Sequence, residues 1–164
     1  KIRRISVKIP AGVLDGSQIK LSGEGEPGVR GGPNGNLYVQ VRVDPHDVFQ
    51  RDGDHILLEY PINFAQAALG DEVEVPTIEG PVLLKIPPGI QSGKALRLKN
   101  KGAYKLWKRG RGDQFVVIRI VSPLSLNEHE EKLFQTLSDT LHKPDIDSYD
   151  GRGGVLDRIK QAFR

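Results

Sequence analysis

The feature that most constrains this chain is an internal repeat. Residues 7–43 and residues 84–120 align without a gap at a constant offset of 77, and ten of the 37 aligned positions are identical. The identical pairs are Lys8/Lys85, Ile9/Ile86, Pro10/Pro87, Gly12/Gly89, Gly16/Gly93, Leu21/Leu98, Gly25/Gly102, Gly35/Gly112, Val39/Val116 and Arg42/Arg119. A register of this length with matched glycines predicts two copies of one small domain.

Each copy has the pattern of short antiparallel strands. Apolar residues alternate with polar ones on three segments, and Pro and Gly separate the segments, which is typical of half-buried strands joined by turns. In the first copy the expected strands carry Ile5, Val7 and Ile9, then Ile19 and Leu21, then the residues of 37–43. The second copy repeats them at Leu84 and Ile86, at Leu96 and Leu98, and over 114–120. The matched glycines are expected to supply positive φ at the turns.

The second copy has additional sequence in front of it. Residues 54–83 predict a strand at 55–60, a helical turn at about 63–69 that ends at Gly70, and a hairpin at 72–84. With the offset of 77, the equivalent of residue 54 would lie at position −23, so we expect the first domain to lack its opening strands. The pattern predicts a mainly β chain of two tandem, homologous, small β-sandwich domains, the first truncated at its N-terminus, followed by C-terminal helices. The expected boundaries are 1–50, 51–124 and 125–164.

The C-terminal region predicts helices. Ser125 followed by Glu128 forms a capping-box pattern, and the apolar residues after it indicate a helix over about 126–142. After the polar linker 143–154, a last short helix carries one apolar side, formed by Val155, Leu156, Ile159 and Phe163. About ten residues are too few to form a stable helix alone in water, so this side must dock on something. We expect it to mediate dimerisation with a second copy, and packing on its own chain is the alternative.

Composition excludes several classes of protein. The chain has no cysteine, which rules out disulfides, cysteine-based zinc sites and a cysteine nucleophile. No apolar run approaches the roughly 18 residues that cross a bilayer, and we expect a cytoplasmic location. The four histidines lie far apart, and no combination of residues indicates a catalytic site. We therefore expect no enzymatic activity and no cofactor.

The sequence motifs resemble a known family. The strings KIPAGV, GEGE, LYVQV, KIPPG and GRGD occur in the order and context found in the C-terminal region of the bacterial DnaJ family of J-domain co-chaperones. The similarity covers about residues 1–141. Neither the J-domain nor the cysteine-rich zinc repeats of that family are present here, so the resemblance implies the part of such a protein downstream of its zinc module, with zinc expected only in that module.

The resemblance also implies a function. Members of the family have two β-sandwich-like C-terminal domains and a dimerisation segment, bind unfolded polypeptides as an added strand, deliver them to a DnaK-type chaperone and act in the heat-stress response. By this resemblance, the client-binding pocket of the first domain maps to Ile5 and Val39, and strand alternation adds Val7 and Val41 on the same faces. The alternative is that Ile5 and Val39 are plain core residues. We expect a homodimer with no membrane partner.

A basic cluster is the second candidate site. Residues 94–111 contain eight cations and no acid, with Tyr104 and Trp107 among them. The cations are Lys94, Arg97, Lys99, Lys101, Lys105, Lys108, Arg109 and Arg111. Cations and aromatic rings together suit single-stranded nucleic acid, so a nucleic-acid binding module is the alternative function. The cluster would also suit an acidic segment of a partner protein, and the simplest interpretation is a solvated loop.

Overall fold

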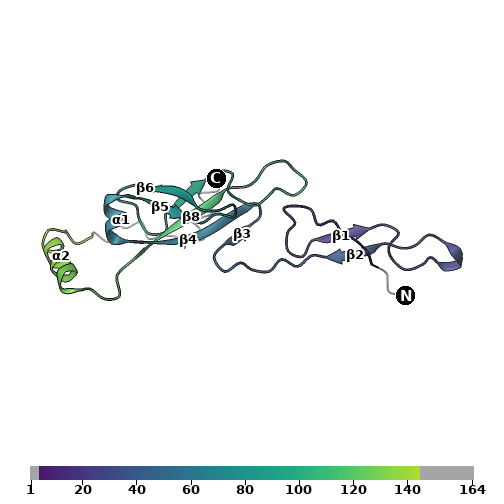
Figure 1. Ribbon diagram of the computed structural model, residues 1–164, viewed down its shortest axis with the longest axis horizontal. Coiled ribbons are helices and arrows are strands. Elements are labelled where there is room, and N and C mark those ends of the chain that lie inside the picture. Colours follow the sequence, from purple (N-terminus) through teal and green to yellow (C-terminus); the bar gives the residue numbers. More distant parts are fainter. Residues whose placement is uncertain (1–3, 145–164) are drawn as a thin grey trace. The chain divides into compact units, whose positions relative to one another are not determined.

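The computed structural model describes residues 4–144, which form two compact units. The first unit comprises the residues up to Leu58 together with Thr77–Glu79 and Arg97–Phe115. The second comprises Glu59–Pro76, Gly80–Leu96 and the residues from Val116 onward. The fold is mainly β, as the repeat predicted, and its strands form three sheets (Figure 1). The predicted domain boundaries at 50 and 124 stay a prediction.

The second copy has all the elements that its sequence predicted. Strand β4 (His55–Asn63) leads into helix α1 (Phe64–Leu69), and β5 (Asp71–Val75) pairs antiparallel with β6 (Val82–Ile86). A four-stranded sheet has the order β3 (Gln50–Asp52), β4, β8 (Gln114–Val121), β7 (Ala95–Leu98). The core of the second unit is apolar, formed by Ile62, Ala67, Val73, Val75, Leu84, Ile86, Ile90, Val116, Val117 and Ile118.

Local sequence explains how α1 is bounded. The Asn63 side chain accepts a hydrogen bond from the Gln66 backbone N–H at 2.8 Å, and the Gln66 side chain accepts one from the Asn63 N–H at 2.9 Å, which is a capping box. Gly70 ends the helix at φ 79°. A Cβ at this position would lie 2.8 Å from the Ile86 carbonyl oxygen, so only glycine fits both the conformation and the space.

The first copy contains less regular structure. Strand β1 (Gln18–Leu21) pairs antiparallel with β2 (Leu37–Gln40), and the Gly-rich segment between them holds a short 3₁₀ turn, Val29–Gly31. The predicted strand at Ile5–Ile9 is wrong, because residues 4–10 have no strand pairing, and the third strand ends at Gln40 rather than at 43. In the second copy the equivalent segment, β6, is held by pairing with β5. No strand is described beside residues 5–9, so they do not complete a ladder.

The turns of the two copies match in their hydrogen bonds. The Gly16 N–H donates to the Val41 carbonyl at 2.9 Å, and the Gly93 N–H donates to the Ile118 carbonyl at 2.7 Å, an offset of 77. The same offset relates the bonds from Val41 N–H to Ser17 O and from Ile118 N–H to Lys94 O. Gly12 and Gly89, and Gly16 and Gly93, all have positive φ between 75° and 86°. The repeat in the sequence is therefore a repeat of backbone geometry.

Helix α2 (Glu128–Ser138) is shorter than the predicted helix and begins later. The predicted cap at Ser125 is wrong: Asn127 is the N-cap, and its side chain accepts from the Glu130 N–H at 2.9 Å while Glu130 accepts from the Asn127 N–H. Both Ser125-x-x-Glu128 and Asn127-x-x-Glu130 fit the capping-box pattern. The second is the one that forms, and the chain at 122–127 has no helical structure.

Candidate functional site

The β1–β2 hairpin presents an apolar row that is only partly covered. The register places Ile19 opposite Val39 and Leu21 opposite Leu37, and all four side chains are half-buried. Val41 follows on the same face and is also half-buried. Among the residues described for the first copy, 4–50, no side chain is fully buried. Within the described residues, no layer of buried side chains closes the apolar face of this hairpin.

The second copy shows what this face looks like when it is covered. Val116 and Ile118, the repeat equivalents of Val39 and Val41, are both 0% exposed. Leu84, the equivalent of Val7, is buried as well, whereas Val82, the equivalent of Ile5, is half-buried. The second copy thus uses as core three of the four positions that the resemblance assigns to client binding.

The segment that precedes the hairpin carries the remaining two candidates. Ile5 is 37% exposed and Val7 is half-buried, and both lie in irregular chain rather than in a strand. Val39 and Val41 are placed by the β1–β2 ladder, whose hydrogen bonds continue through the Val41 N–H to Ser17 O at 2.8 Å. No described contact links Ile5 or Val7 with Val39 or Val41, so the role of these residues stays a prediction.

The outer edge of β2 is open in the described part of the chain. Val41 bonds toward β1, so by strand alternation the backbone groups of Tyr38 and Gln40 point to the other edge. In the second copy the equivalent edge of β8 is occupied by β4, with the Ile56 N–H donating to the Asp113 carbonyl at 3.0 Å. In the first copy the described sheet contains β1 and β2 only. The open edge is a template for an additional strand.

The basic cluster contains some cations in ion pairs and others for which no ion pair is described. Three of its eight cations make ion pairs: Arg97 with Asp113, at 2.6 Å, and Lys101 and Arg111 with Glu79. The Lys101 Nζ lies 3.1 Å from a Glu79 oxygen, and this hydrogen bond lowers the pKa of Glu79. No ion pair is described within residues 4–144 for the other five, namely Lys94, Lys99, Lys105, Lys108 and Arg109.

Asp113 anchors the base of this loop. Its side chain accepts from the Asn100 backbone N–H at 2.7 Å and from the Arg97 guanidinium, and its own N–H donates to His55 Nδ1 at 3.0 Å. Asp113 is 6% exposed, and burial by itself would raise its pKa. The hydrogen bond from Asn100 and the charge of Arg97 outweigh burial, so the pKa of Asp113 is lowered and the carboxylate stays ionised.

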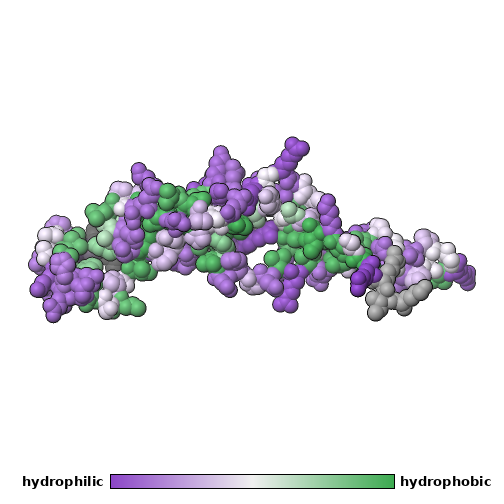
Figure 2. All heavy atoms as spheres, in the orientation of Figure 1, coloured by the Kyte–Doolittle hydropathy of each residue, from purple (hydrophilic) through white to green (hydrophobic). Residues whose placement is uncertain are grey.

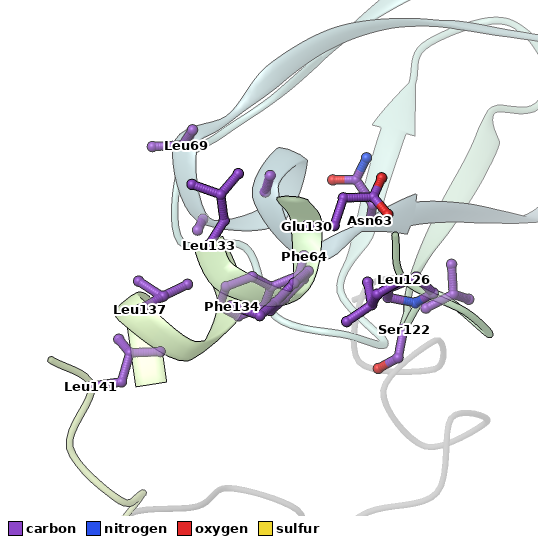
Figure 3. Close-up of a pocket in the computed structure, with 14 residues that line it drawn as sticks. Asn63, Phe64, Leu69, Ser122, Leu126, Glu130, Leu133, Phe134, Leu137 and Leu141 are labelled. Carbon is purple, nitrogen blue, oxygen red and sulfur yellow. The ribbon is translucent and has the colours of Figure 1, made fainter. Parts of the chain in front are cut away.

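Two apolar hollows were not predicted from the sequence. One, in the second unit, has a volume of about 650 Å³ and lies between α1 and α2, where the Phe64 and Phe134 ring centroids are 6.5 Å apart. Figure 3 shows Leu133, Leu137 and Leu141 along one wall of this hollow.

The other hollow, in the first unit, has a volume of about 870 Å³ and is lined in part by Leu14, Val43 and Phe49. Apolar side chains gather in that part of the surface (Figure 2).

A comparison with known families decides the identity of the chain. The family model for the DnaJ C-terminal domain matches residues 1–123. The chain belongs to the DnaJ C-terminal domain family. A chaperone protein DnaJ from Geobacillus kaustophilus is 50% identical over 99% of the chain, and one from Roseiflexus sp. is 52% identical over 98%. The chaperone protein DnaJ of Bacillus cytotoxicus is 49% identical over the whole chain. The chain spans about two fifths of the length of these DnaJ relatives.

Membership of the DnaJ family confirms the resemblance found in the sequence. The predicted dimerisation site, however, falls on residues that the structure does not describe. The predicted dimerisation residues Val155, Leu156, Ile159 and Phe163 lie outside residues 4–144. Within the described residues there is no group of three or more metal-ligating side chains, and no helix there is long and apolar enough to span a membrane.

Proposed function

We propose that this chain is the client-binding part of a DnaJ-type chaperone or co-chaperone, and that it binds extended segments of non-native polypeptides along β2. Family membership and the names of the relatives support the chaperone role. The observation that carries the binding mode is the open edge of β2, whose counterpart on β8 is paired with β4.

Strand addition at this edge suits a chaperone for a physical reason. Backbone N–H and C=O groups pair with any extended segment, so the affinity does not depend on one client sequence. The apolar row beside the edge, formed by Leu37, Val39 and Val41, offers contacts to alternate side chains of the added strand. Ile5 and Val7 belong to the same proposed surface. Client segments would therefore be extended and apolar at alternate positions.

The proposal extends to the longer protein through the family alone. Such a protein would deliver clients to a DnaK-type chaperone in the cytoplasm under heat stress, would act as a homodimer, and would have no enzymatic activity of its own. This chain would need no cofactor, and zinc would belong to a module outside it.

Backbone pairing can be tested with two peptides that differ only in hydrogen-bonding capacity. One is a fluorescent peptide with alternating leucines, and the other carries N-methyl groups on alternate residues so that one edge cannot donate. We expect the first to bind by fluorescence anisotropy and the second to bind at least about tenfold more weakly, because the net free energies of the lost hydrogen bonds add up. Equal affinity of the two peptides would refute strand addition.

The role of Ile5 can be tested with a control from the second copy. Ile5→Asp introduces a charge at the proposed surface, and Val82→Asp introduces it at the same repeat position in β6. We expect Ile5→Asp to weaken peptide binding and Val82→Asp to leave it unchanged, with the far-ultraviolet circular dichroism spectrum checking that each variant is folded. Unchanged binding by Ile5→Asp would remove this residue from the site.

A further inference from the structure

The hollows of the two units are related by the internal repeat. Residues from the segment 44–49 form part of the lining in the first unit, and residues from the equivalent segment 121–126 form part of it in the second. Phe49 and Leu126 are repeat equivalents at the offset of 77, and each lines the hollow of its own unit. The position of the hollow is therefore a feature of the repeated domain.

In the second unit this place is partly filled by the chain itself. Helix α2 follows Leu126 and directs Leu133 and Phe134 toward α1 (Figure 3), where the Phe134 ring centroid lies 6.5 Å from that of Phe64. In the first unit Phe49 is followed by β3 instead of a helix, and the hollow has a volume of about 870 Å³. Because a cavity of about 150 Å³ accepts benzene, this hollow has room for a large apolar side chain.

The hollow of the first unit continues the apolar row of β2. The Val41 N–H donates to the Ser17 carbonyl at 2.8 Å. The Val43 N–H donates to Oδ1 of Asp15 at 2.9 Å, so both N–H groups point toward the same neighbouring segment. Extended alternation therefore persists past the end of β2, and Val43 lies on the same face as Val39 and Val41. Val43 is 39% exposed and lines the hollow, which joins the apolar row to it within one unit.

Hydrogen bonds between side chains and backbone fix the rim of this hollow. The Arg51 guanidinium donates to the Val13 carbonyl at 2.7 Å and to the Gly12 carbonyl at 2.8 Å. On the other side, Nδ1 of His46 accepts from the Phe49 N–H at 3.3 Å. Because these groups are already held, a side chain that enters the hollow has little of it to order, which lowers the entropic cost of binding.

The charges of the lining favour a cation in the ligand. Asp15 and Asp44 contribute two carboxylates, whereas the guanidinium of Arg51 is directed at the backbone carbonyls of Gly12 and Val13. A lysine or arginine next to the bound apolar side chain would be attracted by the two carboxylates, and salt would screen this attraction.

We propose that the hollow of the first unit is a second anchor subsite for an extended client segment, and that it takes a large apolar side chain with a lysine or arginine next to it. The inference rests on the proposed function, because the segment that adds to β2 would carry this side chain past the end of the strand. Residues of that segment beside Val39 and Val43 would be four positions apart, about 13 Å at about 3.3 Å per residue. The client pattern is therefore two apolar residues at i and i+4, with a cation beside the outer one.

The spacing can be tested with symmetric peptides, for which the direction of the added strand does not matter. The probe is the fluorescent peptide Lys-Phe-Ser-Thr-Ser-Leu-Ser-Thr-Ser-Phe-Lys. Its control has one more serine on each side of the leucine, which turns each phenylalanine to the opposite face of the strand. We expect the 164-residue chain to bind the probe about tenfold or more tightly than the control in fluorescence anisotropy, because only the probe buries a phenylalanine in the hollow.

The cation is tested by replacing both lysines of the probe with glutamine. We expect this change to weaken binding at low salt, and we expect the difference between the two peptides to shrink as salt rises. A difference that does not depend on salt would remove the carboxylates from the subsite.

Matched variants assign these effects to the hollow. Val43→Ser and Asp44→Asn change residues that line it, whereas Val48→Ser and Asp47→Asn make the same changes at exposed positions of the same loop that do not line it. We expect Val43→Ser to abolish the preference for the probe over its control, and Asp44→Asn to reduce the gain from the lysines. The Val48 and Asp47 variants should retain both effects. Leu14→Ser changes the lining at another point and repeats the test should Val43→Ser fail to fold.

The outcomes separate this inference from the proposed function. Equal affinity for the probe and its control would overturn the second anchor and leave strand addition at β2 intact, and so would a preference that survives in both Val43→Ser and Leu14→Ser. Failure of both peptides to bind would overturn strand addition, and the second anchor with it.

Discussion

Val39 and Val116 occupy the same position in the two copies, and alanine at each distinguishes a surface residue from a core residue. Val116 is 0% exposed, so Val116→Ala removes two buried methyl groups, worth about 1.6 kcal/mol in transfer free energy at about 0.8 kcal/mol each. The cavity that remains adds to this, giving a loss of about 2–3 kcal/mol in the free energy of unfolding. Val39 is half-buried on a face that is only partly covered. Val39→Ala should therefore cost less than about 1 kcal/mol.

Two measurements test this pair. Urea denaturation gives the stability of each variant, and anisotropy with the leucine peptide gives its binding. We expect Val116→Ala to lower stability while the folded fraction binds normally, and Val39→Ala to weaken binding with little loss of stability. If Val39→Ala cost as much stability as Val116→Ala, the position would be core in both copies and the reasoning from exposure would be refuted.

Three further predictions concern other parts of the structure. The pKa of Asp113 is lower in the folded chain than the ordinary carboxyl pKa of about 3.9. The ionised carboxylate therefore stabilises the fold fully at pH values above about 3.9, and this stabilisation is lost as the pH falls through the pKa of Asp113 in the folded chain. Asp113→Asn should therefore reduce stability at pH 7 and flatten its decline in acid, which denaturation at several pH values would measure. Gly12→Ala should destabilise the first unit, because its Cβ would lie 2.2 Å from the Tyr104 carbonyl oxygen at φ 82°, and a melting temperature equal to that of the unsubstituted chain would contradict this. Asn127→Ala should cost about 1 kcal/mol through loss of the cap of α2, seen as reduced helical circular dichroism, whereas Ser125→Ala should have no effect.

Most of what could be predicted about the fold came from the internal repeat in the sequence. Because glycines at positions 12, 16, 89 and 93 recur with the same offset, the sequence indicated turns that the structure confirms as positive-φ positions. The strand expected at Ile5–Ile9 failed for a nonlocal reason. Its alternation is correct, but a strand also needs a partner, and no strand is described beside residues 5–9.

The functional surfaces were less predictable because they depend on contacts between distant residues. The basic cluster was evident in the sequence, but Glu79, which pairs with Lys101 and Arg111, lies 22 and 32 residues away from them. The hollow between α1 and α2 could have been suspected, since Leu133, Phe134 and Leu137 mark one helix face and the helix buries no residue of its own.

The lack of any fully buried side chain among residues 4–50 has a thermodynamic consequence. A two-stranded hairpin with one uncovered face is only marginally stable, so the amide hydrogens of β1 and β2 should exchange with solvent far faster than those of β4 and β8. A segment that adds to β2 would slow that exchange while it buries the apolar row. Recognition and ordering of the first copy would then be one coupled equilibrium, with the negative heat-capacity change that accompanies burial of apolar surface.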